Sequence, residues 1–381
     1  MKKYVQFVIL MGIVSLLADV VYEGARSVIG PFLATLYVSA TLVGFISGFS
    51  EFIGYASRIL FGFTADKTKK YWFHTFVGYG LIFSIPLLAF TKRWEIVAIL
   101  LILERLGKAI RTPARDTILS SAVRYMGRGV GFGLHEALDQ IGAVAGPIFI
   151  AFALSIGKSY SYSFLLLLIP AVSSILFLSI AKINFPSQYL ERERVESKIG
   201  KTFWLYTSFI FFTTIGFVNF QIISYHLKVQ AIISDEIIPI LYAFAMGLDA
   251  VFALILGKVY DKIGLKTLFL MPVLTTFIPL AFLPNFLAIL LAIAALGIVI
   301  SMHEAIARAA VADLVGINKR ATAYGILYTF YGFAFFIGSL TVGYLYELSI
   351  SAIFLFVIVF EVLAIITLYI TTNSAKSKHL F

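Results

Sequence analysis

Acidic and basic side chains recur at helical spacing inside apolar segments of this sequence. Asp19, Glu23 and Arg26 occupy positions i, i+4 and i+7, which places them on one face of a helix. A later run has the same kind of spacing and consists of Glu104, Lys108, Arg111 and Arg115. A carboxyl group held near a cation in a low-dielectric site can take up or release a proton when its surroundings change. The spacing therefore predicts proton-handling chemistry on these two helices.

Other ionisable residues extend this set. Glu51 and Arg58 share a helix face with Tyr55, and His135 shares a face with Asp139. The candidates for proton coupling are Asp19, Glu23, Glu51, Glu104, Glu136 and Asp139, of which Asp19, Glu23 and Asp139 are favoured as nearest to mid-membrane. Their expected charge partners are Arg26, Arg58, Arg105, Lys108 and Arg111. The alternative is that such charges pair internally and only fix helix packing, which is favoured for Arg58, Arg111, Arg115, Asp116 and Arg308 near the span ends.

The composition indicates that lipid surrounds these helices. Of the 381 residues, 60% are hydrophobic and 13% are charged, and the mean hydropathy is +0.96, far from the values of soluble domains. The absence of cysteine excludes disulfides, thiol chemistry and thiolate metal sites. The net charge of +10 comes from clusters of bases at span ends rather than from a stripe, which argues against nucleic acid as a partner.

Apolar runs long enough to cross a bilayer recur along the whole chain. The expected spans are 5–30, 40–64, 72–90, 95–121, 129–155, 161–183, 203–226, 236–257, 266–283, 286–313, 320–345 and 350–372. With both termini in the cytoplasm, nineteen Lys and Arg residues fall on the inner side and four on the outer side. This positive-inside bias predicts a multi-pass protein of the cell membrane with an even number of spans.

The two halves of the chain repeat each other. Residues 128–146 align without gaps on residues 320–338, at an offset of 192, and this pairs Gly146 with Gly338. The polar stretch between the halves contains Pro186 and a run of alternating charges. These features predict a six-helix bundle over 1–183, a cytoplasmic linker over 184–202 and a second six-helix bundle over 203–381.

The loop after the second span carries the most specific motif. Its residues are Gly62, Asp66, Lys67, Lys69 and Lys70, and a second copy begins at Gly257 and includes Asp261. This pattern resembles the major facilitator superfamily. The resemblance implies an all-α integral membrane protein with twelve transmembrane helices, in two six-helix bundles related by a pseudo-two-fold axis, that works by alternating access. It also implies that the loop is a cytoplasmic gate, in which Gly62 lets neighbouring helices approach each other.

A second motif, made of Gly142, Gly146 and Pro147, looks like the glycine-proline motif of the proton-coupled exporters in that superfamily. It favours export over uptake, although small residues four apart are common in membrane helices of every function. In the fourth span Arg105 fits the family pattern, whereas Lys108 and Ala109 depart from it. That departure puts the proton-handling role of Arg105 in doubt.

Aromatic and polar side chains are candidates for a substrate cavity, because cation–π and apolar contacts would suit a lipophilic cation. They are Tyr22, Tyr55, His135, Gln140, Phe217, Asn219, Gln221, Tyr328 and Tyr331.

The leading hypothesis is a proton-coupled exporter of small amphipathic or cationic compounds. A divalent-metal exporter and a proton-coupled importer of a nutrient or organic anion remain alternatives. His135 and His303 give thin evidence for a metal site, and none is predicted. No enzyme motif, cofactor motif or channel filter is visible. The expected partners are the lipid bilayer, a small-molecule substrate and protons, with a monomer as the expected state.

Overall fold

The computed structural model describes residues 2–123, 128–185, 199–316 and 319–376, and this part of the chain contains helices and no strands. The predicted linker residues 186–198, including Pro186, lie outside the described residues. The helices of the first half are α1 (Lys2–Arg26), α2 (Ile29–Thr35), α3 (Ala40–Thr68), α4 (Tyr71–Gly80), η1 (Leu81–Phe83), α5 (Ser84–Leu87), η2 (Leu88–Phe90), α6 (Trp94–Val123), α7 (Arg128–Ser155), α8 (Tyr160–Leu166) and α9 (Leu168–Asn184).

The helices of the second half follow the same succession of long and short elements. They are α10 (Lys201–Gly216), α11 (Phe220–Val229), α12 (Ile237–Ile263), η3 (Gly264–Phe269), α13 (Leu270–Thr275), η4 (Ile278–Phe282), α14 (Phe286–Ser301), the π-helical η5 (Met302–Ile306), α15 (Ala307–Leu314), α16 (Arg320–Leu348) and α17 (Ile350–Lys376).

Nine stretches of the described chain are long and apolar enough to cross a membrane. One of them, Ile237–Phe282, is 46 residues long and has room for two crossings of about 20 residues each. Helices α3 and α6 are long enough as well, but they carry several ionisable residues and fall outside the nine. Together these segments account for the twelve expected crossings, and the predicted all-α membrane fold is confirmed.

Contacts between residues divide the chain into two compact units. The first unit comprises 1–37, 53–192 and 233–243, and the second comprises 38–52, 193–232 and 244–381. The start of α3 thus groups with the second unit, and the start of α12 groups with the first. The division into halves at residues 184–202 rests on the sequence repeat and stays a prediction.

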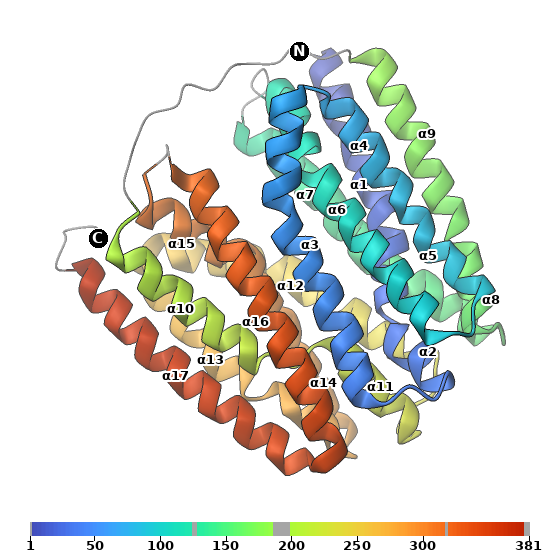
Figure 1. Cartoon of the computed structure of the whole chain (residues 1–381), viewed down its shortest axis with the longest axis vertical. Coiled ribbons are helices and arrows are strands. Elements are labelled where there is room, and N and C mark those ends of the chain that lie inside the picture. Colours follow the sequence, from blue (N-terminus) through green and yellow to red (C-terminus); the bar gives the residue numbers. More distant parts are fainter. Residues whose placement is uncertain (1, 124–127, 186–198, 317–318, 377–381) are drawn as a thin grey trace. The chain divides into compact units, whose positions relative to one another are not determined.

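In the first unit, α1 packs against α7 and α9, while α4 packs against α6 (Figure 1). Small residues make the α1–α7 contact possible. An alanine Cβ at Gly142 would overlap the Leu16 carbonyl, and one at Gly146 would lie 2.5 Å from the carbonyl oxygen of Val20. Both neighbours are backbone atoms, so a side chain at either glycine would push the two helices apart.

The second unit has the same kind of contact, in which a glycine lies against the backbone of a facing helix. Helix α10 packs against α16 and α17, and an alanine Cβ at Gly338 of α16 would overlap the Ile215 carbonyl of α10. Gly338 is the residue that the sequence repeat pairs with Gly146. The repeat therefore extends from residue types to the contacts that they make.

Several of the expected spans are interrupted helices, and the first spans of the two halves are examples. Span 5–30 was expected as one run, but α1 ends at Arg26 and α2 begins at Ile29. Span 203–226 is likewise divided, because α10 ends at Gly216 and residues 217–219 are not helical. Asn219 begins α11 as its N-cap, since its side-chain oxygen accepts from the Ile222 amide at 3.0 Å. Hydropathy averaged over a whole span does not reveal either break.

Candidate functional site

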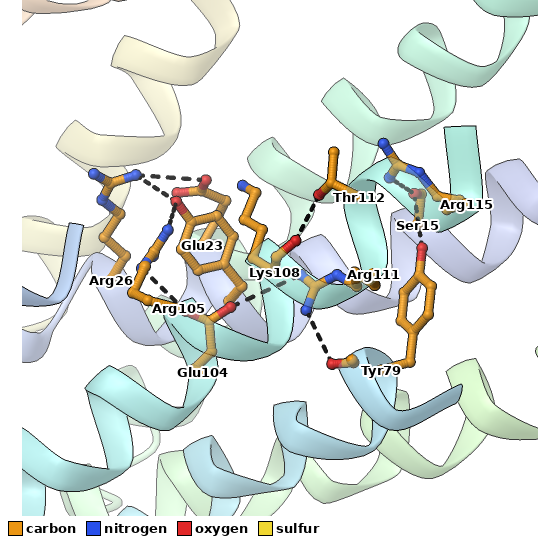
Figure 2. A network of polar contacts seen from close by, with 12 residues as sticks. Ser15, Glu23, Arg26, Tyr79, Glu104, Arg105, Lys108, Arg111, Thr112 and Arg115 are labelled. Carbon is orange, nitrogen blue, oxygen red and sulfur yellow. Dashed lines mark hydrogen bonds and ion pairs between the residues drawn. The ribbon is translucent and has the colours of Figure 1, made fainter. Parts of the chain in front are cut away.

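A tyrosine of α1 lies at the centre of a polar network in the first unit. Tyr22 is 3% exposed, and its hydroxyl accepts hydrogen bonds of 2.6 Å from both Arg26 and Arg105 (Figure 2). The guanidinium carbon of Arg105 lies 3.9 Å from the centroid of the Tyr22 ring, and the ammonium nitrogen of Lys108 lies 4.1 Å from it. One aromatic ring therefore holds cations from two helices by cation–π attraction and hydrogen bonding together.

Two of the predicted proton-coupling acids are already neutralised by partners. Glu23 accepts a 2.6 Å hydrogen bond from the Tyr242 hydroxyl and lies 3.8 Å from Arg26. Glu104 is 1% exposed and lies 3.1 Å from Arg105 and 3.8 Å from Arg111. Such partners offset part of the cost of burying a carboxyl group. These contacts favour a structural role for Glu104, whereas Glu23 joins α1 to the start of α12.

The basic stripe of α6 continues toward the far end of the network. Arg111 donates to the Gly78 carbonyl at 3.4 Å, and its guanidinium carbon lies 5.0 Å from the Tyr79 ring centroid. Arg115 donates to the Ser15 hydroxyl at 2.9 Å, and Ser15 in turn lies 3.3 Å from the Tyr79 hydroxyl (Figure 2). Helices α1, α4 and α6 are joined by this chain of contacts, which sequence spacing could not reveal because it depends on tertiary packing.

Asp19 and Asp139 form the less satisfied part of the site. Both are half-buried, they come from α1 and α7, and Asp19 interacts electrostatically with Asp139, Lys108, Glu23 and Arg111. One carboxylate oxygen of Asp139 is buried without a hydrogen-bond partner among the described residues. Two carboxylates that interact in one site repel each other, whereas Lys108 and Arg111 attract Asp19.

Lys108 differs from the arginines of the same stripe. In the described part of the chain its ammonium lies over the Tyr22 ring rather than in an ion pair. His135, which is 4% exposed, interacts electrostatically with Arg115, Asp139 and Asp116. These residues complete the candidate site, which is built from α1, α6 and α7.

Several predicted residues lie elsewhere. Glu51 is 6% exposed but belongs to the second unit, whereas Glu136 is exposed. Their roles in proton coupling stay predictions. Arg58 stacks on Tyr55, with its guanidinium carbon 4.6 Å from the ring centroid.

The substrate-cavity candidates of the second half are mostly buried. Phe217, Asn219 and Gln221 are at most 6% exposed, whereas Tyr328 and Tyr331 are half-buried, as Gln140 is in the first unit. Asn219 serves the helix break, because its oxygen caps α11 and its nitrogen donates to the Ser339 hydroxyl at 2.7 Å. The backbone break uses this amide, which leaves it unsuited to the predicted substrate contact.

The loop motif is on the surface. Asp66, Lys67, Lys70 and Asp261 are exposed, and Asp66 accepts a 2.9 Å hydrogen bond from Tyr71. The expected close approach at Gly62 is wrong, because an added Cβ would lie 3.7 Å from Pro113, an ordinary van der Waals distance. At Gly257 an added Cβ would meet nothing within 4 Å in the described structure.

Sequence reasoning missed one acid of the second unit. Glu361 lies in α17, is 1% exposed, and accepts a 2.8 Å hydrogen bond from Thr213. The signal was present, because Glu361 is the single acidic residue of the apolar segment Ile350–Ala375. An isolated acid in a membrane span is costly and marks a position worth attention.

Long apolar helices, a glycine contact repeated within each unit and a buried charge network in the first unit are typical of a membrane transport protein. The family model of the Major Facilitator Superfamily matches residues 11–232 and 204–380, and the chain belongs to that superfamily. It is therefore a secondary transporter rather than an enzyme. The predicted superfamily is confirmed, while the exporter subtype stays a prediction.

Related sequences cover nearly the whole chain. An uncharacterised protein of Mycobacterium tuberculosis is 36% identical over 378 residues, which is 96% of this chain and 92% of that protein. An uncharacterised MFS-type transporter of Methanocaldococcus jannaschii is 29% identical over 368 residues, or 92% and 90% of the two chains.

Solved structures share the fold at low sequence identity. The nucleoside transporter NupG has a TM-score of 0.76 and 13% identity over 96% of this chain and 99% of that one. A peptide transporter, POT, has a TM-score of 0.76 and 13% identity over 97% and 94%. A bacterial homolog of the human lysosomal transporter Spinster has a TM-score of 0.72 and 15% identity, covering 96% of each chain.

Proposed function

We propose that this transporter exchanges protons for small amphipathic or cationic organic compounds and exports them by alternating access. The observation that carries the proposal is the electrostatic interaction between Asp19 of α1 and Asp139 of α7, while Glu23 and Glu104 are held by cations and Tyr242. A proton and a cationic substrate would compete for the same two carboxyl groups. Competition at one site is the minimal chemistry of an antiporter.

The tight α1–α7 contact supports the choice of site. Gly142 and Gly146 bring α7 against α1, and Asp139 lies on α7 one turn before Gly142. A movement of α7 along α1 would change the surroundings of both acids together. We further propose that both termini face the cytoplasm, which the bias of Lys and Arg between alternate loops supports.

The test is proton flux into proteoliposomes under an imposed pH gradient, with organic cations added one at a time. Wild type should release protons on substrate addition, and Asp19→Asn and Asp139→Asn should abolish that flux while still exchanging substrate across the membrane. Glu95→Gln is the matched control, because Glu95 is an exposed acid of α6 that pairs with Arg93 at the surface. Normal flux in both Asp variants would refute the assignment.

Uptake of an organic anion together with a proton is the second candidate. Lys108 favours it, because an ammonium that lies on an aromatic ring in the described structure, rather than in an ion pair, could receive a carboxylate. In the same assay, Lys108→Gln would abolish anion-triggered flux if this candidate holds. The divalent-metal alternative gains no support, since the described residues contain no cluster of three His, Asp or Glu side chains that could hold an ion.

A further inference from the structure

Glu361 lies deep within an apolar helix of the second unit. It is eleven residues from the start of α17, or about 16 Å along the axis at 1.5 Å per residue. The surrounding segment, Ile350–Ala375, has a mean hydropathy of 2.8, and the Glu361 side chain is 1% exposed. A negative charge at this depth is costly unless protein groups or a bound cation neutralise it.

The hydrogen-bond donors around Glu361 do not suit a carboxylate. An ionised carboxyl group has about four acceptor positions on its two oxygens. Thr213 donates to one oxygen at 2.8 Å, and the other oxygen is buried without a hydrogen-bond partner among the described residues. A protonated carboxyl group requires fewer donors, so the observed surroundings match the neutral acid better than the ion.

The backbone next to Glu361 also favours a proton. The oxygen without a partner lies 2.6 Å from the position that a Cβ atom would occupy at Gly216, the last residue of α10. Carbonyl groups in the last turn of a helix lack intrahelical donors and form the negative end of the helix dipole. Such an end repels a carboxylate and accepts a hydrogen bond from an O–H group.

Charged groups on the neighbouring helices do not offset the cost of a carboxylate at Glu361. Helix α17 packs against α10, α16, α13, η3 and η4, and the group among them that acts on Glu361 is Thr213. On α10, Lys201 is at the first residue, and Tyr206 donates to the Ala307 carbonyl at 3.0 Å. Lys266 belongs to η3, and the ionisable side chains of α16 include Arg320 and Glu347 near its two ends.

We propose that Glu361 is a second proton-binding site, in the second unit, which is occupied when α10 packs against α17 and is emptied during the transport cycle. The chemistry is limited to one O–H bond: a proton from water binds the carboxylate and later returns to water. Occupancy by itself does not depend on the proposed antiport, whereas release during the cycle rests on it. A proton needs no cavity beside the buried oxygen, unlike a metal cation that requires several further oxygen ligands.

The helix break supplies the movement that release requires. Residues 217–219 are not helical, so α10 can change direction there without losing its internal hydrogen bonds. Phe217 follows Gly216 directly, and its ring centroid lies 5.7 Å from that of His303. Separation of Gly216 from Glu361 would let water reach the acid, and hydration would stabilise the carboxylate as its proton leaves.

The proposal is tested by infrared spectroscopy of the full-length protein in lipid, comparing wild type with Glu361→Gln. At neutral pH the wild type should show a carbonyl stretch of a protonated carboxyl group that is lost in Glu361→Gln. Thr213→Val should keep this band and move it to higher wavenumber, because one hydrogen bond to the acid is removed. Glu95→Gln should leave the band unchanged.

Transport tests the release step. Glu361→Gln preserves the shape of the neutral acid, so it should fold and exchange substrate, but it should lose accumulation driven by a pH gradient. Carboxylate bands in place of the carbonyl band would overturn the proposal, and so would pH-gradient-driven accumulation that is unchanged in Glu361→Gln. An intact band together with absent substrate-triggered flux in wild type would instead refute the antiport mechanism, and with it the release step, while the proton site would stand.

Discussion

Helix α6 and its counterpart in the repeat, which begins with α14, have corresponding positions in the sequence but different side chains on the corresponding face. They begin at Trp94 and Phe286, which are 192 residues apart. In α6 one face carries Glu104, Lys108, Arg111 and Arg115. An offset of 192 replaces these residues with Leu296, Ile300, His303 and Ala307. The charged stripe of the first unit is therefore an apolar face with one histidine in the second.

The glycine contacts show the opposite behaviour, because they are the same in both units. Gly146 lies against a carbonyl of α1, and Gly338 lies against a carbonyl of α10. The glycine contacts between helices are thus the same in both units, whereas the side chains that could handle protons differ. In a duplicated transporter, the shared contacts describe the packing, and the unshared charges indicate where the specific chemistry lies.

The largest expected effect on stability comes from breaking the α6 stripe. Arg111→Leu should lower the free energy of unfolding by about 3 kcal/mol, because it leaves Glu104 with one partner in a buried site. Unfolding in detergent, followed by tryptophan fluorescence, measures the change. Arg93→Gln removes a cation from an exposed pair and should cost less than about 1 kcal/mol. Equal losses in the two variants would contradict the distinction.

The shared glycine contact should be equally sensitive in the two units. Gly146→Ala and Gly338→Ala should each cost about 2 kcal/mol, because the new methyl group overlaps the backbone of a facing helix. Gly133→Ala is the control on α7, since nothing lies within 4 Å of its added Cβ among the described residues. A loss in Gly146→Ala without one in Gly338→Ala would show that the repeat is not preserved in packing energy.

Exchange of a stripe residue for its counterpart should alter binding. Lys108→Ile removes a cation that interacts with Asp19, so an organic cation should bind more tightly by about 1 kcal/mol, or several-fold in Kd. Substrate titration by calorimetry measures the shift. Weaker binding of every cation tested would argue that Lys108 contacts the substrate as an anion receptor instead.

The smallest effect is expected at the single histidine of the apolar face. Neither ring nitrogen of His303 has a hydrogen-bond partner in the described structure, and its ring lies against Phe217 and Tyr331. His303→Leu should therefore change the free energy of unfolding by less than about 1 kcal/mol, since no bonded partner is left behind. A loss as large as that of Arg111→Leu would show that the imidazole has an essential partner.

The sequence predicted the fold from simple physical rules. Bilayer thickness fixes the length of an apolar run, so the number of crossings could be counted. Helical spacing was enough to place Asp19 and Glu23 on one face of a helix. The helix breaks at residues 27–28 and 217–219 were missed, because each lies within a run that is long and apolar enough on average to be counted as one span.

The sequence could not predict which side chains of different helices contact each other. That Glu23 would bond to Tyr242, and that Arg115 would reach Ser15, depends on which helices become neighbours. For the same reason Asn219 was interpreted as a substrate contact although it caps a helix.

The amino-acid sequence by itself determined that this is a membrane protein with many crossings and an internal repeat. The length of an apolar run and the periodicity of residues can be read from the sequence without knowing which helices pack together. Tertiary structure alone decided which acids are satisfied and which are not, because that depends on donors from helices distant in the chain. Glu104 has two arginines beside it, whereas Glu361 has the Thr213 hydroxyl. The partners that packing provides decide how far the cost of burying a carboxyl group is offset.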